Sequence, residues 1–229
     1  MFFFRDKQQQ LLNRALKNRP SGQLKNYLMT PLPDPQQPIS KTQFLVLDFE
    51  TTGLNAQSDH IISMGYTHIS DMRIQLKNSL HQLISTDKKL TSESVSIHQI
   101  TDDQLQQGMA VEEMMNVLLQ QMAGKVIIAH HQAIEYQFIQ HLSHNLYGHH
   151  LPMRMADTLK IEQHRLQRLN LPISVNQLRL FNLRTSYHLP RYHAHNALED
   201  AVATAELFLA QISHRQANGF PLKLKHILS

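Results

Sequence analysis

Two carboxylates stand two residues apart at the end of an apolar stretch. Asp48 and Glu50 follow residues 44–47, whose apolar run is typical of a short buried strand. In a strand, side chains two apart point to the same face, so both carboxylates project toward one point. Adjacent acids repel each other unless a cation lies between them, and a hard divalent cation such as Mg²⁺ prefers carboxylate oxygens. The pair indicates a metal site if further ligands converge on it, and a solvated strand end if none do.

Two stretches further along the chain supply candidate partners. His98 lies in an expected loop before a short helix that is capped by Thr101 or Asp102. Glu135 lies on a helix that follows an apolar strand ending at Ala129. Ligand sites in α/β sheets gather at the carboxyl ends of strands, so Glu135 is expected over the same edge as the first pair. Taken singly, each of these side chains is also compatible with a solvated surface position.

A third stretch, residues 192–208, joins His195 and Asp200 to a run of alanines. The alanines predict a small-residue helix that can lie close to a sheet. Positions five apart on a helix differ in direction by about 140°, so His195 can serve the same site as Asp200 only from the segment before the helix. The alternative is a charged helix start capped by Asn196.

The elements that must position these residues are strands first, and then helices that alternate with strands. Strands are expected over residues 44–48, 60–69 and 73–84 as an antiparallel meander, with 125–129 as a parallel partner of the first. Helices are expected over residues 111–122, 134–146, 157–169, 175–183 and 197–212. This order predicts an α/β fold with a mixed central sheet flanked by helices.

The excess positive charge of the chain lies near its N-terminus. The net charge is +4, and the first 30 residues hold six basic residues against Asp6 alone. Apolar residues with helical spacing over 11–16 predict a basic amphipathic helix that contacts nucleic acid, an acidic membrane surface or a partner, or that packs on its own domain. Four prolines over 31–38 predict a stiff connector. The expected organisation is an N-terminal extension and linker over 1–40, a domain over 41–212 and a C-terminal tail over 213–229.

Composition excludes several classes of protein. The chain has 229 residues and no cysteine, which excludes disulfides and thiolate metal sites. No stretch approaches the roughly 18 uninterrupted apolar residues of a membrane helix. These features favour a cytoplasmic protein and leave its oligomeric state open.

Together the motifs resemble those of the DEDDh group of 3′–5′ exonucleases, which includes the proofreading epsilon subunit of bacterial DNA polymerase III, ribonuclease T and oligoribonuclease. The stretch Asp48–Leu54 is similar to the first motif of the epsilon and polymerase-C type, and His195–Asp200 is similar to the last. Ile97–Thr101 resembles the family's His-Gly-Ile-Thr, with Gln99 in place of glycine, and Asp157-Thr158 also matches. The resemblance covers roughly residues 43–212 and implies a ribonuclease H-like fold.

The middle motif departs from the family's pattern. The family usually has His-Asn and then Phe-Asp, whereas this chain has His130-His131 and then Ile134-Glu135. Glutamate keeps the negative charge but lengthens the side chain by one methylene. The departure leaves turnover rate and substrate choice open.

The resemblance implies two-metal hydrolysis of the 3′ end of a single-stranded DNA or RNA, with DNA favoured, to nucleoside monophosphates. It implies that Asp48 bridges two Mg²⁺ or Mn²⁺ ions, that Glu50 and Asp200 complete the first site, and that Glu135 helps to hold the second. His195 is implied as the base that takes a proton from water. The residues expected to contact the substrate are Phe49, Thr51, Thr52, Gly53, Leu54, His98 and His131.

An alternative from another class is a catalytically weak or inactive nucleic-acid-binding scaffold for a repair or replication partner. The retention of His195 and four acidic positions argues against it, because converging charges have no structural use. Residues 177–181 loosely resemble the short peptides that dock on a sliding clamp, but their apolar side chains fall in an expected helix and favour a core position. The expected partners are a nucleic-acid 3′ end and a polymerase or repair protein, without a membrane.

Overall fold

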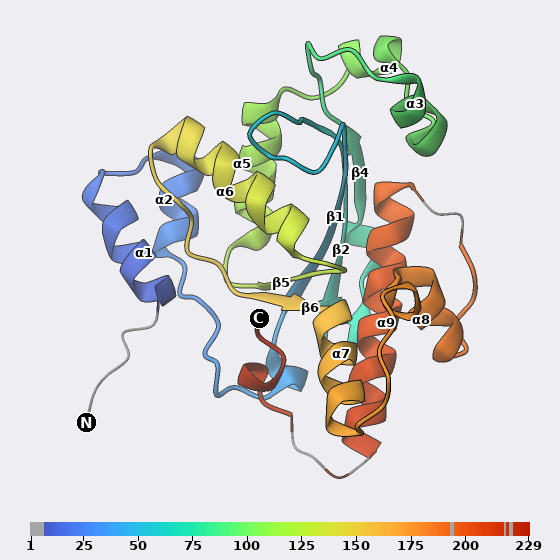
Figure 1. Ribbon diagram of the computed structural model, residues 1–229. Coiled ribbons are helices and arrows are strands. Elements are labelled where there is room, and N and C mark those ends of the chain that lie inside the picture. Colours follow the sequence, from blue (N-terminus) through green and yellow to red (C-terminus); the bar gives the residue numbers. More distant parts are fainter. Residues whose placement is uncertain (1–6, 193–194, 218, 220–221) are drawn as a thin grey trace.

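The computed structural model describes residues 7–192, 195–217, 219 and 222–229. One mixed sheet of six strands lies at its centre, with β1 in the middle (Figure 1). The strands are β1 (Phe44–Thr51), β2 (Ile61–Ser70), β3 (Arg73–Ile74), β4 (Leu80–Leu83), β5 (Val126–Ala129) and β6 (Met155–Asp157). β1 pairs antiparallel with β2 and parallel with β5, while β6 extends the parallel side and β3 and β4 both pair with β2. The predicted α/β fold with a mixed sheet is confirmed.

The prediction of one strand over residues 73–84 is wrong. A short 3-10 helix, η2 (Leu76–Asn78), interrupts it, and leaves β3 and β4 as two short strands along β2. Leu76 is exposed, so the apolar alternation that a half-buried strand needs breaks at that residue. β6 has only three residues, too few to show a periodicity in the sequence.

Helices cover both faces of the sheet (Figure 1). The α-helices are α1 (Lys7–Lys17), α2 (Gly22–Met29), α3 (Ser92–His98), α4 (Asp102–Gln106), α5 (Val111–Met122), α6 (Ala133–Tyr147), α7 (Thr158–Arg168), α8 (Leu180–Ser186) and α9 (Ala197–Ala217). The other 3-10 helices are η1 (Ile39–Lys41), η3 (Asn176–Leu178) and η4 (Leu224–His226). The expected single helix over 175–183 is wrong, because Arg179 has an extended backbone that separates η3 from α8. Leu178 of the clamp-like stretch is buried against α8 and α9, as a core residue would be.

The two faces of β1 bury different clusters. Leu45 and Leu47 pack with α2, α5 and α6, whereas Val46 packs with α7 and α9. Because side chains alternate along a strand, Asp48 and Glu50 lie on the same face as Val46. The pleat of β1 therefore turns both carboxylates toward α9.

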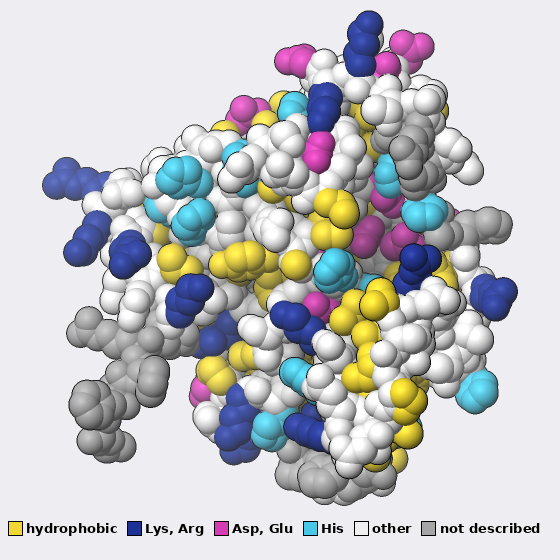
Figure 2. All heavy atoms as spheres, in the orientation of Figure 1, with side chains coloured by type: hydrophobic (Ala, Val, Ile, Leu, Met, Phe, Trp, Pro, Cys, Tyr) yellow, Lys and Arg dark blue, Asp and Glu magenta, His cyan; other side chains and the backbone are white. Residues whose placement is uncertain are grey.

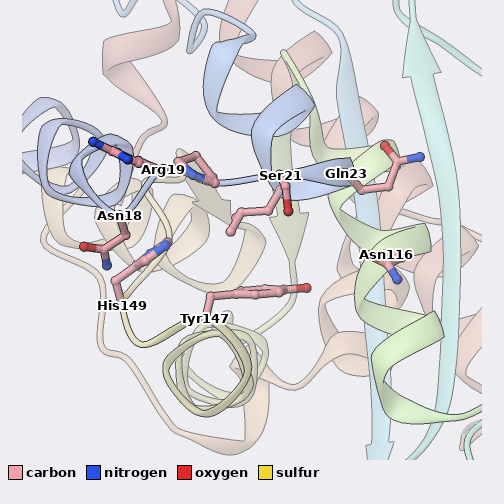
Figure 3. Close-up of a pocket in the computed structure, with 10 residues that line it drawn as sticks. Asn18, Arg19, Ser21, Gln23, Asn116, Tyr147 and His149 are labelled. Carbon is pink, nitrogen blue, oxygen red and sulfur yellow. The ribbon is translucent and has the colours of Figure 1, made fainter.

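The N-terminal helices pack on the α5–α6 side of the sheet. Leu24 and Leu28 of α2 join the cluster formed with β1, and the Tyr27 hydroxyl donates a hydrogen bond to the Pro152 carbonyl. The turn between α1 and α2 faces the end of α6 across a pocket of about 400 Å³, in which Tyr147 and His149 lie opposite that turn (Figure 3). Packing on its own domain, one of the alternatives for the basic segment, is thus observed. The domain boundaries at residues 40 and 212 stay predictions.

Within the part of the chain that the structure describes, no helix is long and apolar enough to cross a membrane.

Candidate active site

The end of β1 and the start of α9 are brought together by Gly65. This glycine pairs with Asp48 across β1 and β2, and a Cβ atom on it would lie 2.1 Å from the carbonyl carbon of Ala197. Only a residue without a side chain lets the first turn of α9 rest directly on the sheet here. This role was not predicted from the sequence, although a glycine inside a strand can mark a close backbone approach.

Three carboxylates converge where these elements meet. One oxygen from each of Asp48, Glu50 and Asp200 lies within 4.8 Å of the others. Glu50 Oε1 and Asp200 Oδ1 are buried and have no hydrogen-bond partner among the described residues. Figure 2 shows acidic side chains recessed beside histidines over the N-terminal end of α9. A donor set made of carboxylate oxygens, two of them buried without a hydrogen-bond partner, fits a hard divalent cation such as Mg²⁺ or Mn²⁺.

The pKa values show how unfavourable this cluster is without a cation. Burial raises the pKa of Asp48 well above its usual value, and the charges of Glu135, Glu50 and Asp200 raise it further. Burial also raises the pKa of Asp200 to about 7, although a backbone hydrogen bond from His195 opposes the shift. The position of Asp200 in the first turn of α9 favours its charged form through the helix dipole. A bound cation would reverse the repulsion that remains.

Glu135 lies at the same edge of the sheet, on the first turn of α6. It is 2% exposed, and burial raises its pKa to about 8, with the charges of Asp157 and Glu50 adding to the shift and backbone amides of Glu135 and Phe49 opposing it. Its carboxylate does not belong to the group formed by Asp48, Glu50 and Asp200. The structure thus places Glu135 close enough to interact with the cluster electrostatically, but outside its tightest set of oxygens.

Asp157 fixes the turn that leads into α6. Its carboxylate accepts hydrogen bonds from the backbone N–H groups of His131 (3.0 Å), Gln132 (3.2 Å) and Leu159 (2.9 Å). His131 is exposed and has a left-handed φ of 65°. In the sequence, Asp157 matches a family motif that implies no role for it; in the structure, it holds the start of α6, which carries Glu135.

His195 lies beside the carboxylates on a left-handed residue with φ of 73°. Its backbone N–H donates to Asp200 Oδ2 at 3.0 Å, and ring nitrogens of His195 and His98 lie within 4.8 Å of a Glu50 oxygen and of each other. The Asn196 side chain accepts from the N–H groups of Leu198 and Glu199, both at 3.1 Å. Both expected features of this stretch are present, since His195 precedes the helix and Asn196 caps it.

His98 is the last residue of α3, so its expected position in a loop is wrong. The polar sequence of this seven-residue helix has too little apolar periodicity to predict it. His98 Nδ1 lies 2.7 Å from Glu50 Oε2. The next residue, Gln99, has a left-handed φ of 56°, which explains in physical terms why a glycine suits this position. The expected cap of the following helix by Thr101 is confirmed, and Gln104 completes a capping box.

The residues at the end of β1 that are expected to contact the substrate differ in their hydrogen bonds and in their exposure to solvent. Thr51 Oγ1 donates to the Gly53 carbonyl at 2.7 Å, and Thr52 accepts at its hydroxyl from the His60 N–H at 3.0 Å. Leu54 is 72% exposed next to this turn. Phe49 is buried in the α5–α6 cluster, which leaves only its backbone to face the site.

A buried arginine braces the segment that leads to His195. Arg184 is 1% exposed and donates to the carbonyls of Ala203 and Pro190, at 2.6 and 2.7 Å, and to Glu206 Oε2 at 2.8 Å. The Tyr192 hydroxyl donates to the other oxygen of Glu206 at 2.8 Å. The network ties α8, α9 and residues 190–192 together. Arg184 lies in a stretch of mixed apolar and polar residues, and no local pattern in the sequence predicts this role.

The sheet order and the carboxylates at the end of its central strand fit the ribonuclease H-like fold that the motifs imply. A family model described as exonuclease matches residues 45–208, and the chain belongs to this family. The resemblance seen in the sequence is thereby confirmed.

Three similar proteins illustrate the family. The PolC-type DNA polymerase III of Thermotoga maritima is 31% identical over 169 residues, which are 72% of this chain and 12% of that protein. The DNA polymerase III subunit epsilon of Treponema pallidum is 29% identical over 171 residues, 75% of this chain and 77% of that protein. The nuclease domain of 3′hExo, a DEDDh family member solved bound to rAMP, shares the fold with a TM-score of 0.64 over 78% of this chain and 95% of that chain, at 12% identity. The chain therefore spans only a small part of the PolC-type relatives that it matches.

Proposed function

We propose that this chain is a metal-dependent 3′–5′ exonuclease that shortens single-stranded DNA to nucleoside monophosphates. The convergence of Asp48, Glu50 and Asp200 within 4.8 Å carries the proposal. Membership of the exonuclease family and relatives named as DNA polymerase III proteins support it.

The donor atoms suit Mg²⁺ or Mn²⁺. Asp48, Glu50 and Asp200 would hold one ion, and Asp48 with Glu135 would hold a second; the bound ions would lower the pKa of a water and stabilise the charge that develops on the phosphate. The role of this chain's own residues is to concentrate negative charge at one point and to keep a base beside it. Proton transfer falls to a ring nitrogen of His195, which is exposed and lies next to Glu50.

The terminal nucleotide is expected to lie over the turn after β1. Exposed Leu54 offers an apolar surface for the last base, and Thr51 and Thr52 lie in the same turn, where they would seat the sugar. Stacking and backbone charge of this kind tolerate any sequence of a single strand. Discrimination between DNA and RNA depends on contacts to the 2′-hydroxyl. The names of the polymerase relatives favour DNA, whereas the neighbour bound to rAMP makes RNA the necessary comparison.

The test is a comparison of DNA and RNA strands of equal sequence. Each strand is labelled at its 5′ end and incubated with Mg²⁺ or Mn²⁺, and the products are separated by length. A ladder that retains the label and shortens stepwise, faster on DNA, is expected. Release of labelled mononucleotide at once would show the opposite polarity, and intact strands in both metals would overturn the proposal.

The position of Glu135 outside the tightest carboxylate group favours one second candidate, a weak or inactive exonuclease fold that binds nucleic acid as a scaffold. Such a protein would bind the labelled strand with metal present and leave it intact. Asp48→Asn is the matched control, because it removes one charge of the cluster and preserves the shape of the side chain.

A further inference from the structure

The far ends of α7 and α9 and the turn η4 enclose an open pocket of about 940 Å³. α7 contributes Arg165 and Arg168, α9 contributes Arg215, and η4 contributes Lys225. Figure 2 shows Lys, Arg and His side chains gathered at this lower end of the molecule. The pocket lies at the opposite end of α9 from Asp200.

The charged residues that line this pocket all carry positive charge. Apart from three leucines, its lining consists of arginines, a lysine and histidines, without an aspartate or glutamate among the described residues. Arg165 is paired with Glu162 at 2.6 Å. Arg168, Arg215 and Lys225 make no ion pair with any described carboxylate. Burial and the charge of Arg168 lower the pKa of Arg215, which an incoming anion would relieve.

We propose that this pocket binds the phosphate backbone of a nucleic-acid strand at a second place, away from the carboxylates. Guanidinium groups bind phosphate through two parallel hydrogen bonds, and arginines supply three of the four permanent cations here. A recess admits a strand but not the flat face of a membrane. The leucines of the lining give apolar surface to sugars and bases. The choice of nucleic acid as the ligand rests on the proposed function.

The carboxylate cluster and the basic pocket lie at opposite ends of one helix, α9. Asp200 and Arg215 are fifteen residues apart on α9, which corresponds to about 22 Å. A stacked strand advances about 3.4 Å per nucleotide, so roughly six nucleotides separate the two places. The pocket would thus hold a part of the strand that is distant from the end being cleaved.

The test measures binding of a labelled single-stranded DNA in chelator, which keeps the strand intact and makes the readout independent of cleavage. Arg168→Gln/Lys225→Gln changes two exposed pocket residues, and Arg73→Gln/Lys77→Gln removes two exposed cations from the β3 edge as a control. Each phosphate contact contributes about 0.7 to the slope of log K against log salt, so the pocket variant should lose about 1.4 of slope and bind about 20-fold more weakly at about 0.1 M salt. The control should match wild type.

Equal losses of DNA affinity in the two variants would show that net charge alone governs binding, and would overturn the proposal that the pocket binds the strand. Undiminished DNA affinity in the pocket variant would overturn it as well. A companion arm uses vesicles that contain phosphatidylserine: loss of vesicle binding with unchanged DNA affinity would assign the cations to a membrane surface instead. Circular dichroism of both variants verifies that the fold is retained.

Discussion

Glu135 replaces the aspartate that is usual in the family. The position of its carboxylate decides whether this replacement changes the cleavage rate. Its Oε2 atom is buried and has no hydrogen-bond partner among the described residues. Even with the longer side chain, its carboxylate stays outside the group of Asp48, Glu50 and Asp200. Glu135 is nevertheless the first of the charges that raise the pKa of Asp48, so we expect the extra methylene to act as an extension toward Asp48 rather than as an obstruction.

Glu135→Asp should therefore be slower than wild type. A displacement of about 1 Å between reacting groups can cost up to about 100-fold in rate. Single-turnover cleavage at saturating Mn²⁺ measures the effect, and Glu135→Gln serves as an isosteric control that lacks the charge. A faster Glu135→Asp would contradict this interpretation and would favour the scaffold alternative.

His195 carries the proton-transfer role in the proposed function. Asparagine tolerates the left-handed backbone of this position and keeps the N–H that bonds Asp200, so His195→Asn removes only the imidazole. We expect the rate constant for cleavage to fall by about 10²–10⁴ with little change in substrate affinity. His188→Asn is the matched control, since His188 is also exposed and left-handed. Equal rates in His195→Asn and wild type would rule out His195 as the base.

Contact between β2 and α9 is the packing feature on which the site depends. The first turn of α9 carries Asp200 and follows His195, and it can rest on β2 only because residue 65 lacks a side chain. A Cβ here would meet backbone atoms, which cannot swing away as a side chain would. The positions of Asp200 and His195, two of the proposed site residues, thus depend on one glycine in another element.

Gly65→Ala should displace α9 and so disable the site. Overpacking of this kind destabilises a protein by about 1–3 kcal/mol, and the displacement should reduce cleavage by a much larger factor than the stability loss explains. Denaturant unfolding and single-turnover rates measure the two effects. Gly148→Ala is the control, because it strains a left-handed glycine of an exposed helix end without touching α9. Normal cleavage by folded Gly65→Ala would contradict the argument.

The elements and site features that have strong local patterns could be predicted from the sequence. The apolar run before Asp48, the cap at Asn196 and the parallel partner strand followed from periodicity and capping rules. β6 and α3 were missed because they are short, and the break at Arg179 depends on a single backbone angle. Arg184 and Gly65 act through distant contacts, which local patterns in one sequence do not encode.

For the molecule as a whole, the carboxylate cluster is expected to make stability depend on pH and on a bound cation. The pKa of Glu135 is raised to about 8 and that of Asp200 to about 7, so the folded protein holds protons that the unfolded chain, with carboxyl pKa values near 4, has released. Stability then falls as pH rises through the folded values. Burial lowers the pKa of His130 to about 4, which acts in the opposite direction but only below the unfolded histidine value of about 6.5.

The melting temperature of the protein in chelator should thus decrease between pH about 6.5 and 8.5, above the range in which histidines contribute. Mn²⁺ should raise the melting temperature, and more so at the upper end of this range, because a cation binds the charged carboxylates. Glu135→Gln should flatten the dependence. A melting temperature that does not change with pH in chelator would show that the carboxylates are not held protonated by the fold.

The claim that Asp48, Glu50 and Asp200 work by holding divalent cations is tested most directly by metal depletion and restoration. Stepwise shortening of a 5′-labelled single-stranded DNA is followed in EDTA, then after Mn²⁺ is added in excess, for wild type and Asp48→Asn. We predict no cleavage in EDTA, recovery of the ladder by wild type with Mn²⁺, and no recovery by a folded Asp48→Asn. Undiminished cleavage in EDTA, or a ladder from Asp48→Asn equal to that of wild type, would contradict the account.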